Sequence, residues 1–152
     1  ELNPIKCYGE KKFRTARERA RWNRLRYDVK VVYPYAILAA AMLKEYDNIL
    51  AAMPEEKRNA YTKAAEKELK KRFGAELKAL DIDQGRILMK LFYRESGKTT
   101  YSVVKDMRGT FSAFVWQGLA VMFGSSMKQG YDPLGEDKDI EEAVKLIEQG
   151  DF

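Results

Sequence analysis

Apolar residues recur along this chain at intervals of three and four, the spacing that places them on one side of an α-helix. No stretch alternates convincingly between apolar and polar residues at the two-residue period of a β-strand. The pattern therefore predicts an all-α protein, folded as a single compact domain of five to seven helices. We expect an irregular N-terminal arm over residues 1–12 and the helical domain over residues 13–152.

Proline and glycine set the predicted limits of the first three helices. The first covers residues 13–32, and Pro34 either ends it or opens the second, because proline lacks the N–H donor that a helix interior uses. The second helix covers residues 34–53. A third begins at Pro54, with acidic residues in its first turn, and should stop near Gly74.

Capping residues mark the next two helices. Asp81 and Gln84 have the spacing of a capping box, with aspartate in place of the usual serine or threonine. The fourth helix therefore starts at this point and ends before Gly97. Thr99 or Thr100 is the expected cap of a fifth helix.

The most apolar stretch of the chain covers residues 111–123. It is too short to span a bilayer, which takes about 20 residues, so no transmembrane segment is expected. We predict instead a buried sixth helix, around which the others pack. A last, acidic helix should follow over residues 139–148.

The 152 residues include no histidine and a single cysteine, Cys7. Catalytic systems that need histidine, imidazole metal sites and zinc sites made of cysteines are therefore excluded. Only carboxylate and carbonyl oxygens remain as metal ligands, so we expect no specifically bound transition metal. We expect no cofactor, and the composition favours a protein without enzymatic activity.

Positive charge is concentrated near the N-terminus. Residues 11–30 hold nine basic residues against Glu18 and Asp28, and their net charge of +7 exceeds the +5 of the whole chain. The acidic tail, residues 136–151, has the opposite sign, so the two segments can attract each other across the fold. The basic helix also offers a candidate anion-binding surface made of Arg17, Arg19, Arg21 and Arg24.

Polar residues interrupt two of the apolar helix faces. Gln84 and Glu95 fall on the apolar side of the fourth helix, and Gln117 lies within the sixth. A buried carboxylate needs a partner, for which Arg108 and Lys98 are the nearest candidates to Glu95. We predict a buried polar network of Gln84, Glu95, Arg108 and Gln117. Alternatively, Glu95 is the acid of a carboxylate-based hydrolase and lines a cleft.

Five stretches of the chain together carry a family resemblance: residues 27–36 (after the arginine-rich lead), 84–95, 99–101, 114–117 and 131–133. They are similar to an uncharacterised Bacteroidetes family of exported helical proteins, known only as a domain of unknown function. The resemblance runs from about residue 13 to the end of the chain. It implies a secretory signal peptide upstream, in agreement with a first residue, Glu1, that is not methionine. It implies a periplasmic or envelope-associated location, but no activity, cofactor or catalytic residue.

Three functions remain open at this point. We favour a non-catalytic interaction or structural module of the cell envelope, whose partner is an anionic envelope component or another envelope protein. The first alternative is the hydrolase that uses Glu95. The second is a binder of nucleic acid or another anionic polymer through the arginine-rich first helix, although export argues against nucleic acid.

Overall fold

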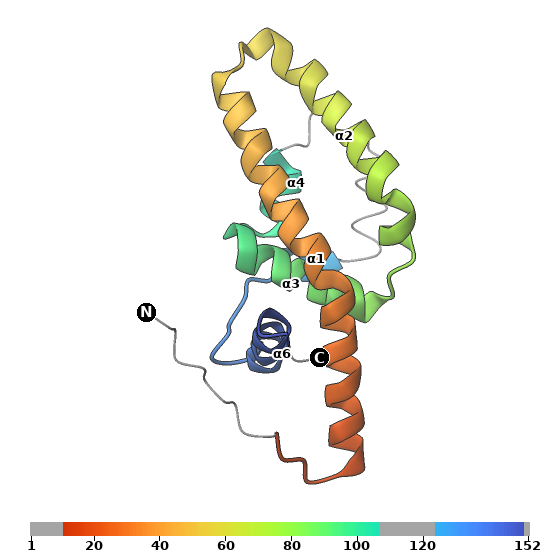
Figure 1. The fold of residues 1–152 in the computed structure, drawn as a ribbon. Coiled ribbons are helices and arrows are strands. Elements are labelled where there is room, and N and C mark those ends of the chain that lie inside the picture. The colour runs from red at the N-terminus through yellow and green to blue at the C-terminus, as the bar shows by residue number, and fades with distance from the viewer. Residues whose placement is uncertain (1–10, 107–123, 151–152) are drawn as a thin grey trace.

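A computed structural model of the chain describes residues 11–106 and 124–150. Its longest element is α1 (Ala16–Ala52), a helix of 37 residues that runs the whole length of the molecule (Figure 1). The remaining elements are α2 (Glu55–Lys78), α3 (Ile82–Ser96), α4 (Thr100–Asp106), the 3-10 helix η1 (Gly124–Lys128) and α6 (Lys138–Glu148). The described ranges contain no strand, which confirms the all-α fold. The predicted core helix over residues 111–123 lies outside them.

The helix boundary predicted at Pro34 is wrong, because α1 passes through this residue without a break. Val29 and Val32 precede the proline and Ala36 follows it, and none of the three has any exposed surface. The proline itself is exposed, so its ring faces solvent rather than the core. An interior proline costs about 3 kcal/mol or more. The burial of Val29 and Val32, each contributing about 1.5–3 kcal/mol, offsets that cost.

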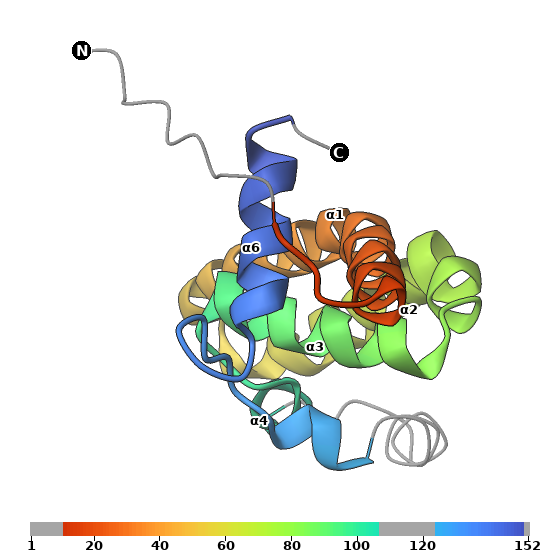
Figure 2. The same ribbon diagram turned by 90° about the horizontal axis from the view of Figure 1, so that it is seen from below.

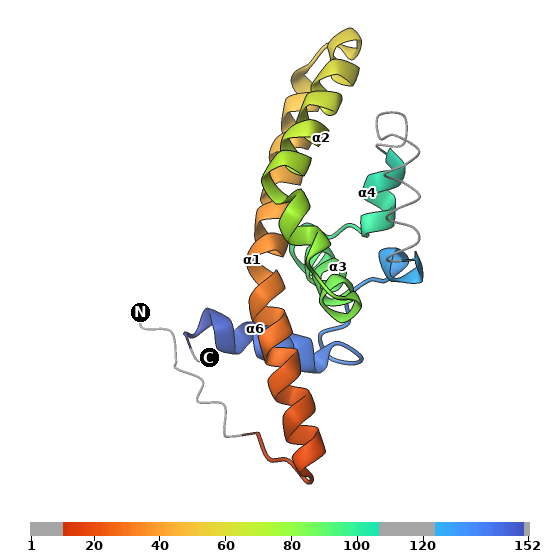
Figure 3. The ribbon, with the colours of Figure 1, turned by 90° about the vertical axis from the view of Figure 1, so that its right-hand side faces the viewer.

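The core lies where α3 and α6 pack against the first half of α1, a region that we call the crossing. In Figure 2, α3 and α6 lie beside α1 at a steep angle to each other, and Figure 3 shows α6 crossing α1 below α3. Each of the three helices supplies part of one apolar cluster. Its buried members are Trp22, Val29, Val32, Tyr33, Ala36, Ile87, Leu91, Ile140, Ala143 and Val144.

The limits of α3 agree with the sequence prediction. The side chain of Asp81 accepts a hydrogen bond from the backbone N–H of Gln84, and the side chain of Gln84 accepts one from the N–H of Asp81, which completes a capping box. The helix ends at Gly97, whose φ of 72° is the left-handed conformation that glycine adopts without a steric penalty. Thr99 then accepts a hydrogen bond from the N–H of Ser102, as expected for the cap of α4.

The second half of α1 and the whole of α2 form an antiparallel hairpin, the arm (residues 37–78), which extends beyond the crossing (Figures 1 and 3). The rings of Tyr46 and Tyr61 stack at a centroid distance of 5.8 Å between the two helices. The hydroxyl groups of Tyr46 and Thr62 are 2.5 Å apart, and Thr62 is the single buried residue of α2. A few aromatic and hydroxyl contacts therefore hold the arm together.

The end predicted for the third helix at Gly74 is also wrong, because α2 continues to Lys78. A glycine inside a helix costs only about 1 kcal/mol relative to alanine. Phe73 and Leu77 on either side are half-buried, and the ring of Phe73 meets that of Tyr35 edge-on at 6.2 Å. These contacts keep the helix intact through the glycine.

Candidate functional site

The first turns of α1 project past α6 and carry most of the predicted anion-binding residues (Figures 1 and 3). Arg17, Arg19 and Arg21, which we call the arginine surface, are all exposed. Neither the Arg17 nor the Arg21 side chain makes a hydrogen bond or ion pair with another described residue. The Arg19 guanidinium lies 5.9 Å from the centre of the Phe13 ring, within the range of a cation–π contact. The arginine surface is thus positive and open to solvent.

The acidic residues of the same part of α1 do little to neutralise this charge. Glu18 lies in the first turn, where its backbone N–H is capped by Thr15 and its carboxylate accepts a hydrogen bond of 2.9 Å from the N–H of Arg14. Asp28 is buried further along the helix, with 3% of its surface exposed. No other carboxylate occurs between them in the sequence.

Arg24 is in a different environment from the other three arginines. Its guanidinium contacts the carboxylates of Asp28 on α1 (3.2 Å) and Asp81 at the start of α3 (2.9 Å). The hydrogen bond with Asp28 is the main reason why the pKa of Arg24 is raised. The side-chain amide of Gln84 donates to Asp28 as well, at 3.1 Å. Arg24 therefore helps to attach α3 to α1 and is not free to bind a ligand.

Two ion pairs join α3 to the segment that starts α6, and we call them the ion-pair ladder. Lys90 Nζ lies 2.6 Å from Asp137, and both side chains are more than nine-tenths buried. One turn later, the Arg94 guanidinium donates two hydrogen bonds, of 2.8 and 3.1 Å, to Glu141. Sequence analysis missed this cluster. The signal was present as two basic residues four apart on α3, and as an acidic residue just before α6 with a second acidic residue four positions later.

Tyrosine hydroxyls complete the hydrogen bonding of the ladder. The Tyr131 hydroxyl donates to Glu141 at 2.7 Å, and the Tyr33 hydroxyl donates to Glu148 at 2.7 Å. Hydrogen bonds from Arg94 and Tyr131 lower the pKa of Glu141, against the opposing effect of burial. Burial, followed by the hydrogen bond to Glu148, raises the pKa of Tyr33 to about 12. These side chains therefore satisfy one another's hydrogen-bonding capacity, as expected of a polar network with a structural role.

Glu95 is not buried, so the prediction that it belongs to a buried polar network is wrong. It is an exposed residue that pairs with its neighbour Arg94, with a quarter of its side-chain surface accessible to solvent. The buried residues of α3 extend only to Leu91, so coverage of the helix ends one turn before Glu95. Lys98, one of the two partners expected for Glu95, pairs instead with Asp47 at 3.1 Å. Gln84 is half-buried and hydrogen-bonded.

Arg108 and Gln117 lie outside the described residues, so the network remains a prediction at these two positions. The hydrolase alternative required a cleft beside Glu95, and Glu95 lines neither the pocket between α1 and α6 nor the one along residues 41–52 of α1. Within residues 11–106 and 124–150, no three Asp, Glu, Cys or His side chains gather closely enough to hold a metal ion. None of the described helices combines the length and the apolar content that a membrane span requires.

The expected attraction between the basic segment and the acidic tail is present, but it is mediated by a lysine. Lys11 Nζ contacts Asp139 at 2.7 Å and Glu142 at 2.9 Å, and it lies 3.7 Å from the centre of the Trp22 ring. Asp139 and Glu142 are therefore paired with Lys11 and are not available to the arginine surface.

Comparison with known proteins places the chain at the level of a family. No curated protein and no solved structure matches it. Residues 1–146 match the model of the family described as Domain of unknown function (DUF4294), and the chain therefore belongs to that family.

Proposed function

We propose that this protein is a non-catalytic interaction module of the cell envelope, and that its arginine surface binds an anionic envelope component. The observation that carries the proposal is the exposure of Arg17, Arg19 and Arg21 on a helix end that projects from the core. Arg24 and Arg94 are paired with carboxylates, so the chain does supply partners to arginines that have a structural role.

Helix polarity supports the proposal. The N-terminal end of a helix carries a partial positive charge, so basic residues in the first turns are unfavourable for the helix itself. An anion bound at this end interacts favourably with both the helix dipole and the arginine side chains. An anionic partner would thus relieve an unfavourable arrangement of charge.

The envelope location rests on the resemblance to a family whose members typically begin with a secretory signal peptide. An exported protein meets anionic phospholipids and polymers at the membrane surface. Basic residues near such a surface each contribute about 1 kcal/mol to binding. The arginine surface therefore suits attachment by electrostatic attraction.

Vesicle binding tests the proposal. We expect the protein to bind phosphatidylglycerol vesicles but not neutral phosphatidylcholine vesicles. It should dissociate as salt is raised, because dissolved ions screen the attraction between exposed charges, with a Debye length of about 8 Å at physiological ionic strength. The double variant Arg17→Glu/Arg21→Glu should bind at least about tenfold more weakly.

The arm offers a matched control. Lys67 and Lys71 are exposed and make no ion pair with another described residue, so Lys67→Glu/Lys71→Glu changes the net charge equally. This control should bind nearly as well as the wild type, and both variants should unfold at the wild-type temperature. Equal weakening in the two variants, or binding that ignores salt, would show that the arginines form only a solvated surface.

A further inference from the structure

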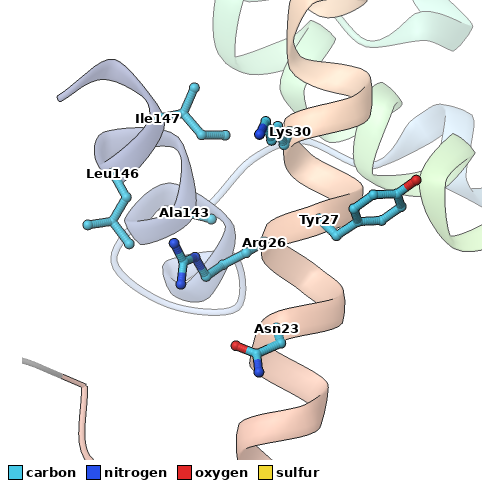
Figure 4. Close-up of a pocket in the computed structure, with 7 residues that line it drawn as sticks. All are labelled: Asn23, Arg26, Tyr27, Lys30, Ala143, Leu146 and Ile147. Carbon is cyan, nitrogen blue, oxygen red and sulfur yellow. The ribbon is translucent and has the colours of Figure 1, made fainter. Parts of the chain in front are cut away.

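A pocket of about 310 Å³ lies between α1 and α6, and its two walls differ in chemistry (Figure 4). The α1 wall is polar and carries two positive charges, whereas the α6 wall is aliphatic. The lining residues are Asn23, Arg26, Tyr27 and Lys30 from α1, and Ala143, Leu146 and Ile147 from α6.

The positive wall centres on Arg26. This residue is half-buried, and its side chain makes no hydrogen bond or ion pair with any other residue in the described part of the chain. Figure 4 shows its side chain reaching from α1 toward α6, whereas the ring of Tyr27 points away from α6. Lys30, one turn further along α1, is the other basic residue of this wall and has an interaction of its own. A guanidinium without a carboxylate partner, in a partly closed site, favours an anion.

The acidic residues of α6 do not supply that anion. Glu142 contacts Lys11, and Glu148 accepts the hydrogen bond from Tyr33. Glu141 is held by Arg94 and Tyr131 on the side that faces α3. The carboxylates of the described helix are thus committed to other partners, and none of them lines the pocket.

The aliphatic wall is fixed in position by the core. Ala143 is buried in the apolar cluster, and Leu146 and Ile147 are half-buried and pack against the same cluster. The pocket is at the small end of the range for ligand sites, about 300–1,000 Å³, which suits a short chain rather than a long one.

We propose that this pocket binds a medium-chain alkyl carboxylate. Its head group pairs with Arg26 and its chain lies against Leu146 and Ile147. The site is separate from the function proposed above, because Arg17, Arg19 and Arg21 do not line it. The proposal can therefore fail while the arginine surface binds its partner, and the reverse also holds.

The test is a titration of the full chain, labelled at its alanine, leucine and isoleucine methyl groups, followed by NMR. Decanoate below its micelle concentration should give saturable shifts at Ala143, Leu146 and Ile147. Affinity should rise through hexanoate, octanoate and decanoate, by up to about fourfold for each methylene that is buried. A flat dependence on chain length, or shifts that do not saturate at these methyl groups, would overturn the proposal.

Two variants separate the head group from the chain. Arg26→Gln should weaken decanoate about tenfold, since a hydrogen bond to a charged group is lost, and should leave the weak binding of octanol unchanged. Arg17→Gln removes an equal charge outside the pocket and should leave decanoate binding intact. Unchanged methyl spectra without ligand establish that both variants fold.

An equal loss of affinity in the two variants would show that the carboxylate is attracted by the overall positive charge of the protein, and this would disprove the site. Decanoate that binds the wild-type chain only when presented in vesicles would also disprove it.

Discussion

The two halves of α1 experience opposite environments within one continuous helix. In the crossing, Val29, Val32 and Ala36 have no exposed surface, and buried ion pairs tie the neighbouring helices together. In the arm, no residue of α1 after Ala36 is buried, and Ile37 and Leu38 are 44% and 40% exposed. The buried residues of α1 all lie between Trp22 and Ala36, the part of the helix that packs against α3 and α6. Tertiary coverage, rather than helix propensity, therefore distinguishes the two halves.

This difference concentrates stability at one end of the molecule. Regions with few buried apolar contacts open at a lower free energy than the core does. We expect substitutions in the crossing to change the free energy of global unfolding, and equivalent substitutions in the arm to change it little.

The buried ion pair should give the largest contrast. Lys90→Met leaves the Asp137 carboxylate buried without its cation, which should cost about 3–5 kcal/mol of the free energy of unfolding. In the arm, Lys70→Met removes an ion pair with Glu66 in which the lysine side chain is 55% exposed, and it should cost less than about 1 kcal/mol. Urea unfolding followed by circular dichroism measures both. Similar costs for the two variants would contradict the comparison.

Truncation of apolar side chains should give the next largest effect. Leu91 is fully buried between α3 and α1, so Leu91→Ala should lose about 3 kcal/mol through lost burial and the cavity that remains. Leu38→Ala removes the same atoms from an exposed position on the arm and should lose less than about 1 kcal/mol. The two variants can be compared in one set of chemical denaturation curves. A cost for Leu38→Ala as large as that for Leu91→Ala would place the arm within the core.

The pH dependence of the free energy of unfolding should show the contribution of the ion-pair ladder. In the folded protein the pKa of Glu141 is lowered from its ordinary value of 4.5. The ionised carboxylate therefore stabilises the fold above pH 4.5, and this stabilisation is lost as the pH falls below that value toward the lowered pKa. Glu141→Gln should reduce stability at neutral pH by about 1–2 kcal/mol and should show a shallower loss below pH 4.5. Unfolding midpoints measured across the acidic range test this. A variant curve parallel to that of the wild type would mean that Glu141 does not titrate with folding.

The smallest effect is expected inside the arm. Tyr46→Ala removes the ring stacked on Tyr61 and the hydroxyl contact with Thr62. We expect faster amide hydrogen exchange in α2, at residues 55–78, with little change in α3 or in the global unfolding temperature. Exchange that accelerates equally in α3 would show that the arm and the crossing unfold as one unit.

Local signals in the sequence predicted some features of the fold correctly. The capping box of Asp81 and Gln84, and the glycine end of α3 at Gly97, depend on interactions between near neighbours in the chain. The apolar residues spaced three and four apart on α1, such as Val29, Val32 and Ala36, are likewise buried together, as the apolar pattern of the chain indicated. Such features follow from short-range geometry and need no knowledge of what packs where.

The errors arose where distant segments decide the outcome. Pro34 is tolerated because α3 and α6 cover α1 on both sides of it, which no local rule reveals. Glu95 shares the helical direction of Leu88 and Leu91 but lies beyond the covered part of α3. Lys90 was overlooked because its partner, Asp137, is 47 residues away in the sequence. Charge counting identified the basic segment but could not separate the paired Arg24 from the exposed Arg17.

The continuity of α1 has a mechanical consequence. At 1.5 Å per residue the helix is about 55 Å long, and among the described residues its buried contacts are those with α3 and α6 in its first half. It can therefore act as a lever with a fixed pivot. A rotation of about 10° at the pivot would displace the end of the helix at Ala52, about 24 Å beyond Ala36, by roughly 4 Å. A force applied at the arginine-bearing end would be transmitted to the tip of the arm without any change in secondary structure.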